Sequence, residues 1–287
     1  MKFAADRIQG VMLALASAFF FALAGIMVKK AVCSYDTDIF QLGFIRFFSA
    51  GILVMTISAL ERKPLRTFNK KYFLLRGFFG SAGNLICFLI IALAGLGRGM
   101  VLMQLTGVFG AVAAIFLLKE KLNIFLTLAV ASAGAGILFF SGFKLTAGVE
   151  MLAFAGAACS GLGLVFVRRM NETDSMHTVF FSQCICGTIL AAFTLIIAGF
   201  PLSWNCWIPG LLLTFFDAVG QYLMTAALKK VSVAVTGPLL MTTPVITLLT
   251  GIFFFSEKMD LFQWIGTILI LTGSFTAATA HQCRKTA

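Results

Sequence analysis

Two stretches of the chain, IFLLKEKL at 115–122 and IFFFSEKM at 252–259, lie 137 residues apart and share one pattern of aromatic and charged residues. With this shift and no gap, twelve positions between 78 and 136 are identical to positions in the second half, where chance would give about five in so biased a composition. The identities include the aromatic pair Phe78-Phe79 and the charged pair Glu120-Lys121. The sequence therefore contains an internal duplication.

The residues around both copies are strongly apolar. Of the 287 residues, 60% are apolar and only 11% are charged, and the mean hydropathy is +1.00. A soluble domain carries about 25% charged residues, so this composition excludes an ordinary cytosolic enzyme, a nucleic-acid-binding module and a disordered chain. It predicts an all-α polytopic membrane protein, since no run alternates with the period of two that a β-barrel needs.

The expected membrane spans are ten apolar runs of about 20 residues, the length that crosses a bilayer core. They cover 8–28, 40–60, 73–95, 98–118, 124–143, 148–167, 177–199, 207–228, 231–255 and 260–280. Two repeats of five spans follow, over 1–145 and 146–287. Because five is odd, the second repeat enters the membrane inverted, an arrangement typical of transporters whose halves rock about a central site. The alternative is a duplicated helical bundle with no transport role.

The basic residues between the spans indicate an orientation. Sixteen of them fall on the side of the N-terminus and five on the other side. The positive-inside rule then places both termini in the cytoplasm. Because these residues form small groups rather than one face, the formal net charge of +11 does not indicate a nucleic-acid partner. The expected surroundings are a lipid bilayer.

Helix-weakening residues recur at equivalent places in the fourth and ninth spans. A proline removes a backbone donor, and a glycine loosens a helix more weakly. Corresponding interruptions in two repeats are a pointer to a transport site, although a plain packing kink is the alternative. The residues at and beside these interruptions are Gln104, Thr106, Gly107, Thr242, Thr243 and Pro244.

Two ionisable residues fall deep within expected spans, Arg46 in the second and Asp217 in the eighth. Such groups are costly in a bilayer unless they face a cavity or a partner. If both line a cavity, their opposite charges would bind a zwitterion such as an amino acid. If they pair with each other, the site is nearly neutral and aromatic. Asp217 is also the candidate carrier of a coupled proton. A uniport mechanism, which needs no coupled ion, is an equal alternative.

Polar side chains at helical spacing form two stripes in the third and eighth spans. The stripes consist of Arg76, Gly80 and Asn84, and of Thr214, Asp217, Gln221 and Thr225. Under the repeat shift Asn84 corresponds to Gln221, so two amides are expected at equivalent depth. They either line a central cavity or form hydrogen bonds between helices. Arg76 lies close to a helix end and is expected to reach the membrane interface.

The chain resembles the drug/metabolite transporter superfamily, specifically the ten-helix EamA-type permeases of bacteria. The resemblance covers essentially the whole chain and rests on loose motifs in a consistent order. These are the region from Gly10 to Lys29, FIRFFSAGIL at 44–53, LRG at 75–77, the two stretches at 115–122 and 252–259, and the run from Ala227 to Pro244. One departure is Gly107, where the family often has a proline equivalent to Pro244. The family commonly has an arginine at the position of Arg46.

The resemblance implies a secondary transporter of the bacterial inner membrane that moves a small organic metabolite by alternating access. An amino acid or a derivative is the expected substrate, and S-adenosylmethionine or a nucleotide-like metabolite is the alternative. Glu120 and Glu257, at family-like positions, are expected to anchor helix ends. The chain is expected to act as a monomer or a homodimer.

Other kinds of site find little support in the sequence. The seven cysteines form no CxxC motif, and the two histidines, His177 and His281, lie near helix ends. We expect no metal site, no cofactor and no catalytic residue. A membrane-embedded enzyme or a channel is the distant alternative.

Overall fold

The computed structural model describes residues 2–35, 37–118, 124–140, 148–198, 204–230, 239–240 and 242–280. Within these residues the chain forms helices and no strand, which confirms the all-α fold class. The helices are α1 (Lys2–Tyr35), α2 (Ile39–Leu60), α3 (Lys70–Ala94), α4 (Leu96–Leu102), α5 (Leu105–Leu118), α6 (Ile124–Phe140), α7 (Val149–Met170), α8 (Met176–Ala198), η1 (Trp204–Cys206), α9 (Trp207–Lys230), α11 (Thr242–Phe255) and α12 (Leu261–Ala280).

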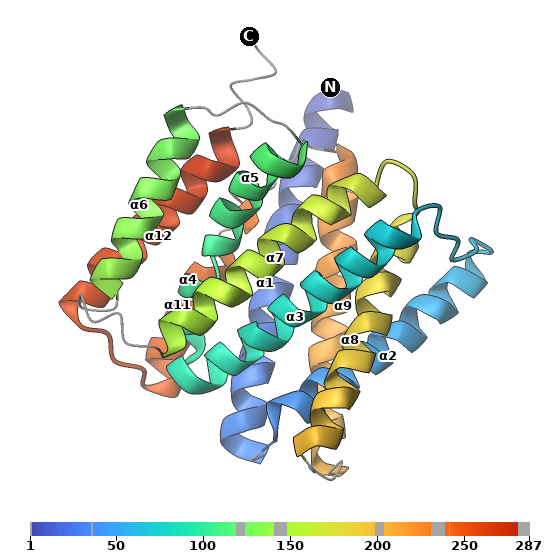
Figure 1. Cartoon of the computed structure of the whole chain (residues 1–287), viewed down its shortest axis with the longest axis horizontal. Coiled ribbons are helices and arrows are strands. Elements are labelled where there is room, and N and C mark those ends of the chain that lie inside the picture. Colours follow the sequence, from blue (N-terminus) through green and yellow to red (C-terminus); the bar gives the residue numbers. More distant parts are fainter. Residues whose placement is uncertain are drawn as a thin grey trace.

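The helices cross the molecule in one bundle (Figure 1). The pair α6 and α12 forms one edge, the pair α2 and α8 forms the other, and α1, α3, α7 and α9 lie between them. We call the end at which α1 begins, at the top of Figure 1, the upper end. The end at which α1 finishes and α2 begins is the lower end.

In the part of the chain that the structure describes, five helical stretches are long and apolar enough to cross a membrane. They are Ile8–Tyr35, Ile39–Leu60, Lys70–Ala94, Val149–Val167 and Met176–Ile197. Shorter apolar stretches lie within α6, α11 and α12. Many large apolar side chains of the helices are exposed, among them Phe116 of α5 and Phe253 of α11 at 78% and 76%, because a bilayer covers that surface in place of protein.

The span expected over 98–118 is interrupted and is divided into α4 and α5. At the joint, the amides of Gln104, Thr106 and Gly107 donate to carbonyls three residues earlier, the tighter pattern of a 3₁₀ turn. The Gln104 carbonyl also accepts a hydrogen bond from Ser274 Oγ of α12 at 2.9 Å. The interruption therefore lies just before Thr106-Gly107. The gap expected between the spans 73–95 and 98–118 is also shorter, since α3 ends at Ala94 and α4 begins at Leu96.

The second repeat reproduces the division of the first. Thr242–Phe255, the bounds of α11, lies 137 residues after Leu105–Leu118, the bounds of α5. In the same way α8 begins 137 residues after α2. Residues 231–238 and 241, which precede α11, lie outside the described residues.

The helix contacts follow an approximate two-fold relation between the repeats. The packing of α1 on α9 is matched by that of α7 on α3, the packing of α2 on α9 by that of α8 on α3, and the packing of α1 on α11 by that of α7 on α5. Two equivalent pairs contact each other directly, α2 with α8 and α6 with α12. This pattern is the one that two inverted five-helix repeats produce.

The pair α6 and α12 lies near the approximate two-fold axis that relates the two repeats. Ser132 Oγ donates to the carbonyl of Leu269 at 2.9 Å, and these residues are 137 apart. Equivalent residues of two repeats meet in this way only near their axis. Glycines allow the close approach, because a Cβ on Gly266 would lie 2.6 Å from the carbonyl oxygen of Gly136.

An apolar cluster joins helices of both repeats at the lower end. Its side chains come from α1, α2, α3, α4 and α9, and Val28, Leu42, Leu96 and Leu213 are at most 1% exposed. Close-packed apolar side chains of this kind leave little room for water between them. Among the described residues, this packing closes the lower end between the repeats.

Candidate central site

A cavity of about 420 Å³ lies between helices of both repeats. Its size falls within the range of small-molecule sites, about 300–1,000 Å³. The lining residues are Phe21, Ala24, Gly25, Arg76, Gly80, Asn84, Cys87, Phe88, Ile91, Met100, Met103, Gln104, Thr106, Gly107, Ser160, Leu164, Gln183, Leu213, Asp217, Gln221, Leu240 and Thr243. The cavity is thus lined by both amide or hydroxyl groups and apolar side chains.

The structure brings seven of the ten sequence-predicted site residues together around this cavity. They are Asn84, Gln104, Thr106, Gly107, Asp217, Gln221 and Thr243. Three others do not line it: Arg46 is fully buried behind Asp217, Thr242 Oγ1 donates to the carbonyl of Leu239 at 2.8 Å, and Pro244 is buried in the first turn of α11. Of the expected stripe on α9, the side chain of Thr225 lies outside the described residues.

Arg46 and Asp217 form an ion pair with each other. Nη2 of Arg46 donates to Oδ2 of Asp217 at 2.7 Å, and the two side chains are 1% and 14% exposed. The guanidinium also lies over the ring of Phe47, with its carbon 4.3 Å from the ring centroid. Of the two arrangements left open by the sequence, the pair that neutralises itself is the one observed.

Arg76 is the charged lining residue that sequence reasoning missed. The expectation that it reaches the membrane interface was wrong: its guanidinium lies along the cavity wall, where Nη2 donates to Oε1 of Gln183 at 2.9 Å. It occupies the space above Gly80, since a Cβ on that glycine would collide with Nη1. The available signal was the four-residue spacing of Arg76, Gly80 and Asn84, which places them on one helix face.

The surroundings of Arg76 are repeat-related to the Arg46–Asp217 pair. The repeat shift of 137 relates Arg46 to Gln183 and Gly80 to Asp217. Where Arg46 donates to the Asp217 carboxylate, Gln183 Nε2 donates to the backbone carbonyl of Gly80 at 3.1 Å. The second repeat thus has an acid, Asp217, at this position of the cavity wall. The first repeat has Gly80 there, and the side chain of Arg76 occupies the space.

Glu257 joins the repeats at the lower end. Its carboxylate accepts hydrogen bonds from the amides of Leu96 at 2.6 Å and Gly97 at 3.0 Å, in the first turn of α4. Lys29 Nζ of α1 lies 4.0 Å away. Gly95 makes the approach possible, since its φ of 100° and ψ of 167° are accessible essentially to glycine alone. Glu257 is therefore a helix-end anchor; Glu120 lies outside the described residues.

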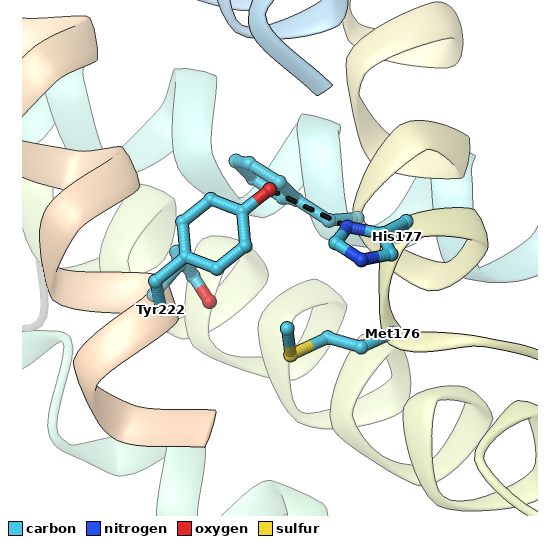
Figure 2. Close-up of a pocket in the computed structure, with 5 residues that line it drawn as sticks. Met176, His177 and Tyr222 are labelled. Atoms are coloured by element: carbon cyan, nitrogen blue, oxygen red, sulfur yellow. Dashed lines mark hydrogen bonds between the residues drawn. The ribbon is translucent and has the colours of Figure 1, made fainter. Parts of the chain in front are cut away.

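A second, smaller pocket of about 30 Å³ lies near the upper end, between α8 and α9 (Figure 2). The hydroxyl of Tyr222 lies 3.5 Å from Nδ1 of His177, and Nε2 of the same ring lies 3.3 Å from Glu61 Oε2. A hydrogen bond from Lys63, and then the positive charge of that ammonium, lower the pKa of the Glu61 carboxyl below its ordinary 4.5, with a further contribution from His177. This cluster ties the end of α2 to α8 and α9.

Among the described residues, no group of three or more His, Cys, Asp or Glu side chains could hold a metal ion. The described cysteines, Cys33, Cys87, Cys159, Cys184, Cys186 and Cys206, are free thiols.

An inverted-repeat helical bundle with a polar cavity between its halves defines a multi-pass membrane transporter. A model of the EamA-like transporter family matches this chain twice, over residues 8–142 and 148–279. The chain belongs to that family. This confirms the resemblance inferred from the motifs, and the membership points to a permease rather than an enzyme.

Two individual proteins extend the comparison. The uncharacterized transporter YoaV of Bacillus subtilis (strain 168) is 23% identical over 276 residues, which cover 90% of this chain and 93% of that protein. A protein of known crystal structure, 17% identical, superposes with a TM-score of 0.64 and covers 94% of this chain and 97% of its own. At this identity the second likeness concerns the fold alone.

Proposed function

We propose that the chain is a secondary transporter that carries a small organic metabolite by alternating access. The observation that supports this most directly is the position of the cavity, between inverted repeats whose contacts are paired by an approximate two-fold relation. Two related halves can exchange roles, so that the cavity opens to each side in turn. The sealed lower end, with its apolar cluster and the Glu257 anchor, is one of the two closures that such a cycle needs.

The proposed setting is the bacterial inner membrane, with the upper end in the cytoplasm. The excess of basic residues in the loops on that side supports this orientation. The chain acts as a monomer or a homodimer. An amino acid or a derivative is the proposed substrate, because the cavity combines amides and hydroxyls with the apolar side chains of Phe21, Phe88 and Met100. S-adenosylmethionine or a nucleotide-like metabolite is the alternative.

The proposed site consists of the seven cavity-lining residues predicted from the sequence. Arg46, Thr242 and Pro244 support this wall without lining it. Asp217 is the proposed carrier of a coupled proton, because it is the one acid among the described lining residues. Transport rates that do not change between about pH 5.5 and about pH 8 would exclude a proton carried by a group in this range.

The function is tested by blocking the cavity without disturbing the packing. A Cβ on Gly107 meets no atom within 4 Å, although this residue lines the cavity. Gly107→Phe therefore places an aromatic ring at the cavity from a backbone position whose first side-chain carbon meets no neighbour. The matched control is Gly134→Phe in α6, where a Cβ also meets no atom within 4 Å and the residue is exposed outside the cavity.

The measurement is exchange of radiolabelled amino acids and S-adenosylmethionine into proteoliposomes that hold the same compounds. We expect the wild type and Gly134→Phe to exchange at least one compound, and Gly107→Phe to lose the exchange while it retains its elution volume and melting temperature. Equal exchange by both variants would contradict the central cavity as the transport site.

A further inference from the structure

The charges around the cavity do not balance. Among the described lining residues, Arg76 and Asp217 are the charged ones. The carboxylate of Asp217 already binds Arg46, which contributes a positive charge from behind the wall. Two arginines and one acid therefore leave a net charge of +1, and this excess lies at Arg76.

Arg76 is incompletely satisfied by the protein groups around it. Gln183, a neutral amide, is its hydrogen-bond partner among the described residues, and its Nε is buried without any partner. A buried donor left unpaired costs about 1–3 kcal/mol, and more when it is charged. The repeat-related Arg46 has a carboxylate in the corresponding place. An anion on the ligand would supply the counter-charge that Arg76 lacks.

The absence of a side chain on Gly80 makes room for this guanidinium. The side chain lies over Gly80, where a Cβ would collide with it, and a Cβ on Gly163 of α7 would lie 3.6 Å from Nη1. The guanidinium is thus held beside the cavity by the packing of α3 on α7. This position fixes where along α3 an anion can bind.

The cavity is polar near Arg76 and apolar farther along α3. Gln183 contacts Arg76 at one end, Asn84 lies about midway along the lining stretch of α3, and Phe88 and Ile91 line the other end. Arg76 and Ile91 are fifteen residues apart, or about 22 Å along a helix. A ligand that fits this gradient has an anionic group at one end and an apolar body at the other.

We propose that Arg76 is the substrate-anion residue, and that the transported molecule is a small organic carboxylate with an apolar body. A planar carboxylate can accept two hydrogen bonds from one guanidinium. This assignment rests on the proposed transport function and adds the substrate class. It requires no cation on the substrate, since Asp217 is already neutralised by Arg46.

The assignment is tested on purified full-length protein with matched pairs of probes. L-phenylalanine and phenylacetate are each compared with their amides, which keep the shape and remove the negative charge, and inorganic phosphate is a separate anion. Binding is measured as the concentration-dependent rise in melting temperature. The variants are Arg76→Gln and Arg76→Lys, and the control is Arg169→Gln, which makes the same charge change at an exposed ion pair at the end of α7.

We expect at least one carboxylate to stabilise the wild type, and its amide to bind at least 10-fold more weakly. Arg76→Gln should weaken the carboxylate about 10- to 100-fold, the effect of a charge-assisted hydrogen bond. Arg76→Lys should recover part of this loss, and Arg169→Gln should bind as the wild type does. Melting temperatures without ligand establish that each variant is folded.

Three results would overturn the assignment: amides that bind as well as acids, phosphate that binds in place of carboxylates, or no stabilisation by either acid. Its failure is distinct from a failure of the transport function. If proteoliposomes exchange a neutral or cationic compound and Arg76→Gln keeps the rate, the transporter remains and the carboxylate class is wrong. If carboxylates bind through Arg76 but no compound crosses the membrane, the site remains and the transport function is wrong.

Discussion

The guanidinium of Arg46 and the carboxylate of Asp217, 171 residues apart in the chain, are joined at 2.7 Å between α2 and α9. The pair links a helix of the first repeat to a helix of the second, and Arg46 is 0% exposed. Its geometry makes the two residues one neutral unit of the cavity wall rather than two independent ligands for a zwitterion.

Breaking this pair from either side should destabilise the protein. Asp217→Asn leaves the fully buried Arg46 without a counter-charge, and we expect a loss of about 3–5 kcal/mol in unfolding free energy. Arg46→Gln should be milder, because Asp217 borders the cavity and keeps access to water. The double variant should recover much of the loss, since both charges are then absent.

Thermal unfolding of the four proteins in one detergent provides the double-mutant cycle. Additive losses in the double variant would show that the two side chains do not act as a pair. Undiminished transport by both single variants would exclude the earlier idea that their charges bind a zwitterion.

Glu257 should stabilise the sealed lower end through its hydrogen bonds to the amides of Leu96 and Gly97. We expect Glu257→Gln to lower the unfolding free energy by about 1–2 kcal/mol, the contribution of an N-terminal helix cap. The control is Glu172→Gln, because Glu172 is an exposed acid, 65% accessible, in an ion pair with Arg169. Equal losses in both variants would contradict a special role of Glu257.

Gly95 should tolerate no side chain. Its backbone conformation is accessible essentially to glycine, and a Cβ would lie 2.5 Å from Oε1 of Glu257. Gly95→Ala should therefore cost about 1–3 kcal/mol. Gly107→Ala, whose Cβ meets no neighbour, should leave the melting temperature almost unchanged. Comparison of the two melting temperatures checks the prediction, and a stable Gly95→Ala variant would contradict the observed turn.

The Glu61 cluster should contribute stability that depends on acidic pH. Because contact with Lys63 lowers the pKa of Glu61 in the folded protein, the contribution is fully present above the ordinary pKa. It is lost as the pH falls through the lowered one. Between about pH 3 and about pH 5, the melting temperature of the wild type should rise more steeply than that of Glu61→Gln. Parallel curves would indicate that the carboxylate contributes nothing.

Cys33 provides a native reporter of orientation. It is exposed near the end of α1, at the lower end, whereas Cys184 and Cys206 are buried. If the upper end is cytoplasmic, a membrane-impermeant maleimide should label the wild type from outside in spheroplasts, and Cys33→Ser should lose the label. If the label is lost in Cys283→Ser and not in Cys33→Ser, the protein has the opposite orientation in the membrane.

Much of the cavity wall could be predicted from spacing alone. Asn84 and Gln221 occupy equivalent places in the repeats, and both line the cavity. The position of the break in the fourth span could not be read from Gly107, because the carbonyl of Gln104 is stabilised there by Ser274, a residue 170 positions away. Arg76 was missed for a similar reason: its depth depends on how α3 packs against α7, and not on its distance from the helix end.

The sequence by itself determined the apolar spans, the duplication and hence the inverted repeats, because hydropathy and repeat identity are properties of the chain that a bilayer converts directly into topology. The tertiary structure decided which polar groups meet. The pairing of Arg46 with Asp217 and the incompletely paired state of Arg76 depend on the tilt, rotation and close approach of helices from both repeats, and these follow from side-chain packing across the whole bundle.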